Sequence, residues 1–142
     1  MKTRPSWLCG LVALAPLGLA QEIGDGHAAE MAEGMQLFKE RVRPVFVEEC
    51  LYCHGGGKVK GDFDLSFRER LLEEGLDGPR VAPGDPENSW LLKLVRHEEV
   101  PHMPAKAEKL ADEDIEAIEE WIRLGAPYDR PLVDTEEGGT GM

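Results

Sequence analysis

Five consecutive residues, Cys50-Leu51-Tyr52-Cys53-His54, constrain this 142-residue chain more than any other feature. They place two thiols one helical turn apart and an imidazole directly after the second thiol. Each thiol can add to one vinyl group of a porphyrin, and the imidazole can then bind the iron as its proximal ligand. The motif therefore predicts one covalently attached haem c, held by Cys50 and Cys53 with His54 on the iron.

Two other uses of the cysteine pair have to be weighed against haem attachment. A thioredoxin-like redox dithiol expects a βαβ pattern around the motif, and the sequence shows none. A zinc site would need two further ligands, which His97 and His102 could in principle supply. Haem attachment is favoured because the residue after the second cysteine is histidine and because the chain is also expected to be exported.

Residues 1–20 are typical of a secretory signal peptide. Lys2 and Arg4 precede an apolar run that ends in small residues, so cleavage is expected near Ala20. The run is too short to span a bilayer comfortably, and no integral membrane span is expected after its removal. An exported, periplasmic chain would keep only Cys50 and Cys53, both of which the haem would use.

The sequence after the signal peptide is long enough for one domain. Residues 21–34 are expected to form a flexible lead-in, irregular over 21–27, and then the start of the first helix. The domain itself is expected over residues 35–130. Residues 131–142, which are acidic and rich in glycine, are expected to be a disordered tail.

The pattern of apolar residues predicts helices. Spacings of three and four from about residue 28 predict a first helix whose buried stripe is Met31, Met35, Phe38, Val42 and Val45. Pro44 is expected to kink or end this helix, with a further helical stretch leading to Cys53. On this interpretation Met31 and Met35 pack in the core and do not bind iron.

Three more helices are expected beyond the motif. A capping box that starts at Ser66 predicts a short helix, and Asp85 followed by proline predicts another, with His97 as a solvated residue near its end. The last helix is predicted over residues 112–124, before Gly125. Its apolar stripe is Ile115, Ile118, Trp121 and Ile122.

The proline-bounded loop at residues 100–105 suggests a second iron ligand. Met103 precedes a proline in this loop, and restricted backbone lowers the entropy lost in holding its sulfur on iron. A neutral thioether favours ferrous iron, so His54/Met103 ligation would raise the reduction potential. His102 as the ligand, which would give a bis-histidine haem, and an open sixth position remain alternatives.

The chain is strongly acidic. It contains 16 Lys and Arg against 28 Asp and Glu, a formal charge of −12, and loss of the leader with Lys2 and Arg4 would make it more negative. Such a protein would be repelled by nucleic acid and by anionic lipid, and attracted to a redox partner with a basic docking face. The charge could equally serve only to keep an exported protein soluble.

These residues, taken in order, resemble the planctomycete-type cytochrome c domain over most of residues 35–128. The matching segments are Val42-Arg43-Pro44-Val45-Phe46, the motif through Gly55, Lys58-x-Lys60-Gly61, Pro83-Gly84-Asp85-Pro86, Ser89 through Leu92, Met103-Pro104 and Trp121-Ile122-x-Leu124-Gly125-Ala126-Pro127. Two positions depart from the family: Ala111 replaces an expected Ser or Thr helix cap, and Asp62 replaces an expected second glycine.

The resemblance implies an all-α, class I cytochrome c-like fold wrapped around one haem. It also implies Cys50 and Cys53 as thioether sites, His54 as proximal ligand and Met103 as distal ligand. Electron transfer is then the expected function, and not enzymatic catalysis. The alternative is a haem-based gas or redox sensor, or a small peroxidase-like enzyme, either of which needs a displaceable sixth ligand.

Overall fold

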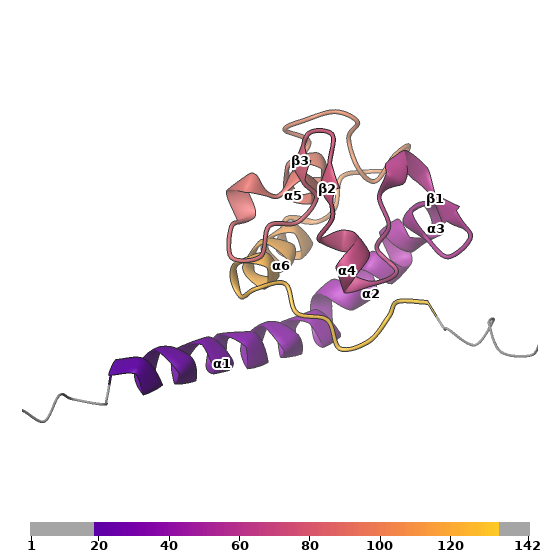
Figure 1. Ribbon diagram of the computed structural model, residues 1–142. Helices are drawn as coiled ribbons and strands as arrows, with labels where there is room; N and C mark the ends of the chain where they lie inside the picture. Colours follow the sequence, from indigo (N-terminus) through magenta and orange to yellow (C-terminus); the bar gives the residue numbers. More distant parts are fainter. Residues whose placement is uncertain (1–18, 134–142) are drawn as a thin grey trace, which may run out of the picture.

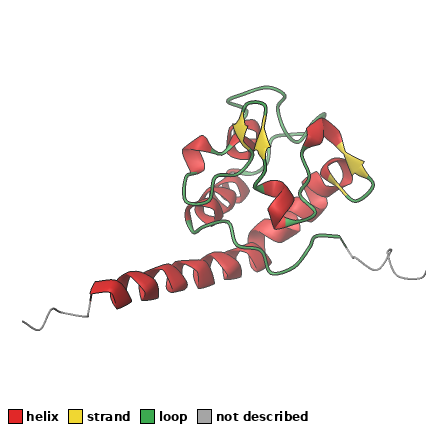
Figure 2. Ribbon diagram, viewed as in Figure 1, coloured by secondary structure: helices red, strands yellow, loops and turns green. Residues whose placement is uncertain are grey.

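The computed structural model describes residues 19–133, so most of the expected signal peptide and residues 134–142 of the expected tail lie outside the described residues. The described chain is mostly helical, with helices of different lengths joined by loops (Figures 1 and 2). The all-α prediction is correct only in part, because a small antiparallel sheet pairs β2 (Glu74–Gly75) with β3 (Gly78–Pro79). None of the helices within residues 19–133 is both long and apolar enough to cross a bilayer.

Helix α1 (Leu19–Leu37) extends away from the body that the other elements form (Figure 1). The expectation of an irregular lead-in over residues 21–27 is therefore wrong, because this segment is helical. Two glycines interrupt its sequence, but each costs a helix only about 1 kcal/mol relative to alanine, and the following Ala- and Glu-rich stretch favours helix.

The helical path continues from α1 to the motif without a break in backbone conformation. It passes through a π-helical segment η1 (Phe38–Val42), α2 (Arg43–Val45), a second π-helical segment η2 (Phe46–Cys50) and α3 (Leu51–His54). Pro44 lies at the start of α2 and does not end the helix. Proline has no N–H to donate, and the chain changes to five-residue bonds on both sides of it, from Arg43 N–H to the Phe38 carbonyl and from Leu51 N–H to the Phe46 carbonyl.

Short elements follow the motif. They are β1 (Lys58–Val59), the 3₁₀ turn η3 (Lys60–Asp62), α4 (Arg68–Leu71), the β2–β3 hairpin, the 3₁₀ turn η4 (Pro86–Asn88) and α5 (Trp90–Val95). Asp85 caps η4 as predicted, since its carboxylate accepts a hydrogen bond from the Asn88 N–H. Ser66 does not cap α4; its hydroxyl instead accepts a bond from Gly56 N–H, on the segment just after the motif.

Helix α6 (Asp112–Arg123) forms one wall of the core, and its bounds agree with the prediction to within one residue. Its predicted stripe of Ile115, Ile118, Trp121 and Ile122 is buried. Ala111 provides no side-chain cap, but three acidic residues in the first turn interact favourably with the helix dipole. Gly125 follows the helix with a positive φ of 96°, which ends it.

Aromatic side chains from distant parts of the chain meet in this core. The Trp121 ring stacks on Phe38 with centroids 5.6 Å apart and meets Phe46 edge-on at 5.5 Å. Its indole N–H donates to the Pro127 carbonyl at 2.8 Å. Trp121 is thus a core residue packed on the first helical run, as predicted, and it fixes the run that carries the motif.

Residues 131 and 132, at the start of the expected tail, are tied to the domain, as is residue 130 before them. Arg43 donates hydrogen bonds to the carbonyls of Arg130 and Pro131, at 3.2 and 2.9 Å. Leu132 is buried, and its N–H donates to the Ser66 carbonyl at 2.9 Å. The ordered chain therefore extends beyond residue 130, and only residues 134–142 of the expected tail lie outside the description.

Candidate functional site

The cysteine pair lies in continuous helical backbone. Cys50 is the last residue of η2 and Cys53 lies in α3, so the two thiols are three residues apart on a helical path and share one face. Both are half-buried, and neither forms a disulfide. Cys50 packs against the main hydrophobic core, so this attachment position borders the apolar interior that a porphyrin would need.

The imidazole of His54 is held in one orientation. Its Nδ1 lies 3.0 Å from the Phe63 carbonyl oxygen, and a carbonyl can only accept, so Nδ1 carries the proton. The Phe63 ring also meets His54 edge-on, with centroids 5.4 Å apart. The other nitrogen, Nε2, then keeps its lone pair for a metal, which is the arrangement that orients a metal-binding histidine.

The segment after the motif folds back over His54 and fixes its backbone. The His54 carbonyl accepts a hydrogen bond from Leu65 N–H at 2.7 Å, and His54 also pairs with Val59 in an isolated bridge. Tyr128, from the other end of the domain, donates to the Leu65 carbonyl at 3.0 Å. His54 is therefore held by both its ring and its backbone.

Asp62 stands where the family resemblance predicts a second glycine, and it adopts the backbone conformation that favours glycine. Its φ is 54°, in the left-handed region that glycine adopts most easily and that aspartate tolerates better than most residues. The Asp62 carboxylate pairs at 3.2 Å with the buried guanidinium of Arg80, which also binds Glu73. The turn keeps the conformation a glycine would adopt, and the aspartate adds an ion pair.

The Cys50 thiol is kept in its neutral form. Removal from water, with a smaller effect of the neighbouring Glu49 carboxylate, raises the pKa of Cys50 to about 12. A thiol with this pKa is almost fully protonated at neutral pH. Because the thiolate is the species that attacks disulfides and reacts with oxidants, burial protects Cys50 from disulfide chemistry with Cys53.

Met103 is fixed at the end of α5. Its backbone N–H donates to the Leu94 carbonyl at 3.2 Å, and its carbonyl oxygen lies 3.1 Å from His97 Nε2. The Met103 side chain is half-buried and packs against the same core cluster as Cys50. No hydrogen bond within the described chain joins His54 to Met103.

The neighbouring imidazoles are placed differently from the prediction. The prediction of a solvated His97 is wrong, because its side chain is half-buried and its Nε2 is hydrogen-bonded to the Met103 carbonyl oxygen. Its positive φ of 62° turns the chain back toward the loop that contains Met103. His102 is exposed and its ring stacks on His97, with centroids 4.4 Å apart and an interplanar angle of 4°. The geometry therefore favours Met103 over His102 as a core-facing ligand.

A zinc site gains no support from the geometry. Within the part of the chain that the structure describes, no group of three or more His, Cys, Asp or Glu side chains is placed to hold a metal ion. The two free thiols and the adjacent imidazole, whose orientation the Phe63 carbonyl fixes, are instead the set that haem c attachment uses.

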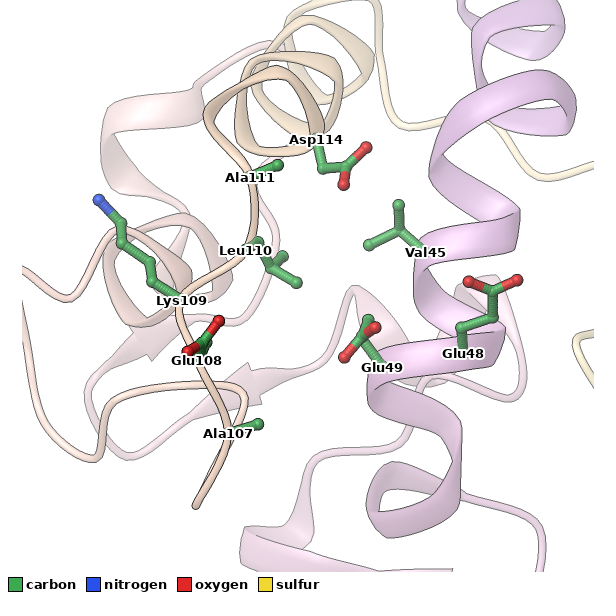
Figure 3. Close-up of a pocket in the computed structure, with 9 residues that line it drawn as sticks. All are labelled: Val45, Glu48, Glu49, Ala107, Glu108, Lys109, Leu110, Ala111 and Asp114. Atoms are coloured by element: carbon green, nitrogen blue, oxygen red, sulfur yellow. The ribbon is translucent and has the colours of Figure 1, made fainter.

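One cavity lies beside the motif, and its walls are not those of a haem pocket. It has a volume of about 280 Å³ and separates the η2 helix from the loop before α6 (Figure 3). Four carboxylates line it, from Glu48, Glu49, Glu108 and Asp114. Cofactor pockets are mostly apolar, so this acidic cleft is a separate surface feature.

The comparisons with known proteins found similarity to one family. Residues 50–106 match the family model described as Planctomycete cytochrome C, so this segment is similar to a cytochrome c-type domain. The family is the one that the sequence resembles, although the match covers less than half of the 142 residues. No curated protein and no solved structure matches the chain.

A cytochrome c-type domain binds haem and carries electrons, and the family implies covalently bound haem c with its iron. The match starts at Cys50 and ends three residues after Met103, so it contains the whole predicted ligand set. Sequence reasoning missed two groups that position those ligands, the Phe63 carbonyl and the His97 ring. The carbonyl is backbone and has no sequence signal, whereas His97 could have been noticed as an imidazole near Met103.

Proposed function

We propose that this chain is an exported monohaem c-type cytochrome that carries electrons, with haem c bound through Cys50 and Cys53 and with His54 and Met103 as the axial ligands. The observation that carries the proposal is the hydrogen bond between His54 Nδ1 and the Phe63 carbonyl, directly after two free thiols on one helical face. A histidine held in this way presents Nε2 as a ligand without further rearrangement.

The residues of the chain have distinct parts in this function. Cys50 and Cys53 would hold the haem through thioether bonds, each made by adding one S–H across a vinyl double bond, which needs no oxidant. When bound, haem c would supply an iron that changes between the ferrous and ferric states. His54 and Met103 would bind that iron, and the neutral sulfur of Met103 would favour the ferrous state.

Export and a basic partner complete the proposal. The leader sequence supports export, since haem c is attached outside the cytoplasm, and the formal charge of −12 supports docking to a partner with a basic face. Electron transfer requires only a closed iron site and a docking surface. The many carboxylates are therefore interpreted as a solvated surface that steers the partner.

Removal of both thiols tests the attachment. We expect Cys50→Ala with Cys53→Ala to abolish the haem that stays with the polypeptide on a denaturing gel, because no thioether can form. Tyr52→Phe is the matched control, because Tyr52 is exposed between the two cysteines and removal of its hydroxyl group should leave haem attachment unchanged. Haem retained by the double alanine variant would disprove the attachment sites.

Replacement of Met103 tests the distal ligand. We expect Met103→Ala to lower the reduction potential and to let the iron bind carbon monoxide rapidly, because the stabilising sulfur is lost. His102→Ala is the comparison variant, since it removes the alternative ligand and should open the iron far less than Met103→Ala does. If His102→Ala opened the iron and Met103→Ala did not, the ligand assignment would be reversed. Rapid carbon monoxide binding by the parent protein would favour a sensor or peroxidase-like function.

A further inference from the structure

The segment between α5 and Met103 has little packing of its own. Residues 98–102 are all exposed, and Val100 retains 72% of its accessible surface. The chain therefore leaves the domain after His97 and returns to it at Met103, whose side chain is the next to be half-buried. The position of Met103 depends on how firmly this return point is held.

Two hydrogen bonds hold the backbone of Met103 at the return point. Its N–H donates to the Leu94 carbonyl at 3.2 Å, and Leu94 is a buried residue of α5. Its carbonyl oxygen accepts the second bond, from His97 Nε2 at 3.1 Å. The first bond is between backbone groups and survives any substitution, but the second depends on one side chain.

His97 is suited to this contact by its backbone and by its neighbour. A left-handed φ of 62° places it where the chain reverses after α5. A carbonyl only accepts, so Nε2 carries a proton and donates it. The parallel His102 ring, 4.4 Å away, covers one face of the imidazole and restricts its rotation.

We propose that His97 is a positioning residue for the distal ligand: its Nε2–H holds the Met103 carbonyl and thereby keeps the Met103 side chain turned toward the core and onto the iron. This inference rests on the proposed function, because it requires Met103 to be the ligand. His97 does not contact the reacting centre, and it acts by slowing the excursions of Met103 away from it.

The test compares four variants of the matured, haem-loaded protein. His97→Asn shortens the side chain beyond reach of Met103 but tolerates positive φ, so it should still fold. His97→Gln keeps an N–H donor near the position of Nε2. Met103→Ala is the reference for an open site. His27→Asn, at an exposed position of α1, controls for loss of an imidazole elsewhere.

Two readouts are measured after circular dichroism has shown that each variant is folded. The first is the rate at which the ferrous protein binds carbon monoxide, and the second is hydrogen exchange of the Met103 amide. We expect His97→Asn to raise both by about three- to tenfold, the effect of losing one hydrogen bond. His97→Gln should recover much of the parent behaviour, and His27→Asn should match the parent.

The outcomes separate this inference from the proposed function. If Met103→Ala opens the iron but His97→Asn behaves like the parent in both readouts, the role of His97 is wrong and the ligand assignment stands. If His97→Gln is as open as His97→Asn, the hydrogen bond is not what positions Met103, and the inference also fails. If Met103→Ala leaves carbon monoxide binding unchanged, the ligand assignment itself fails.

Discussion

A side chain at Gly55, directly after His54, would force the neighbouring side chains to move. A Cβ atom built there would lie 2.2 Å from Leu51 Cδ1 and 2.9 Å from Ser66 Oγ. Leu51 lies between the two cysteines, and Ser66 bonds to Gly56 N–H, so both neighbours belong to the segment that orients His54. The motif is thus packed directly against the loop that returns over it.

We expect Gly55→Ala to destabilise the protein by about 1–3 kcal/mol, the usual cost of overpacking, and to reduce haem incorporation. Gly57→Ala is the matched control, because a Cβ at Gly57 would meet nothing within 4 Å. Chemical denaturation and the haem content of purified protein measure both effects. Equal stability of the two variants would contradict the close packing described here.

The candidate donor residues come from the sequence pattern, and their role as ligands stays a prediction, whereas the groups that orient them could not be predicted. Cys50, Cys53 and His54 form a contiguous motif, and Met103 stands out because of the prolines around it. The hydrogen bond to His54 comes from the Phe63 backbone, and backbone carbonyls have no sequence signature. Ser66 was expected to cap a helix, yet tertiary structure gave its hydroxyl a different donor, Gly56 N–H.

At the scale of elements, the helical run from α1 to α3 connects the core to the motif. Its buried positions could be predicted in part from the 3.6-residue period, since Phe38, Val42 and Val45 are buried, whereas Met31 and Met35 are only half-buried. The effect of Pro44 could not, because the chain bypasses the missing N–H by widening its helix on both sides. Helix-breaking rules assume α-helical bonding, and a π segment relaxes that assumption.

The contact between α1 and α6 depends on a close approach at Gly34. A Cβ there would lie 2.9 Å from Leu124 Cβ and 3.1 Å from Pro127 Cγ, at the end of α6. Gly26, two turns earlier in the same helix, has nothing within 4 Å. A comparison of substitutions at Gly34 and Gly26 therefore distinguishes the effect of packing α1 against α6 from the helix propensity of the substituted residue.

We expect Gly34→Ala to lower the free energy of unfolding by about 1–3 kcal/mol, because the new methyl group forces α1 away from α6. Gly26→Ala should be neutral or stabilising by up to about 1 kcal/mol, since alanine favours helix. Denaturant titrations of the haem-loaded protein give both values. A Gly34→Ala variant as stable as Gly26→Ala would show that α1 does not pack on α6 as described.

At the scale of the molecule, charge is the property that most constrains partners. The chain has 16 basic residues against 28 acidic ones, and four carboxylates, from Glu48, Glu49, Glu108 and Asp114, line the acidic cleft beside η2 (Figure 3). A surface of this kind attracts positively charged molecules over distances of about 10 Å at moderate ionic strength. It would slow encounters with anionic ones.

We expect the protein to exchange electrons faster with a cationic small metal complex than with an anionic complex of similar potential at low salt. The two rates should converge as ionic strength rises, because salt screens the long-range attraction. Stopped-flow measurements from about 10 mM to about 1 M salt follow this convergence. Rates that did not change with salt for either complex would remove charge steering from the account.

The measurement that tests the account most directly is the absorption spectrum of the matured protein, oxidised and reduced, with and without carbon monoxide. Haem held by two thioethers, His54 and Met103 predicts a sharp low-spin c-type spectrum that carbon monoxide leaves unchanged. Rapid carbon monoxide binding would contradict the closed site and with it the function of a simple electron carrier. A protein matured without haem would contradict the account at its centre.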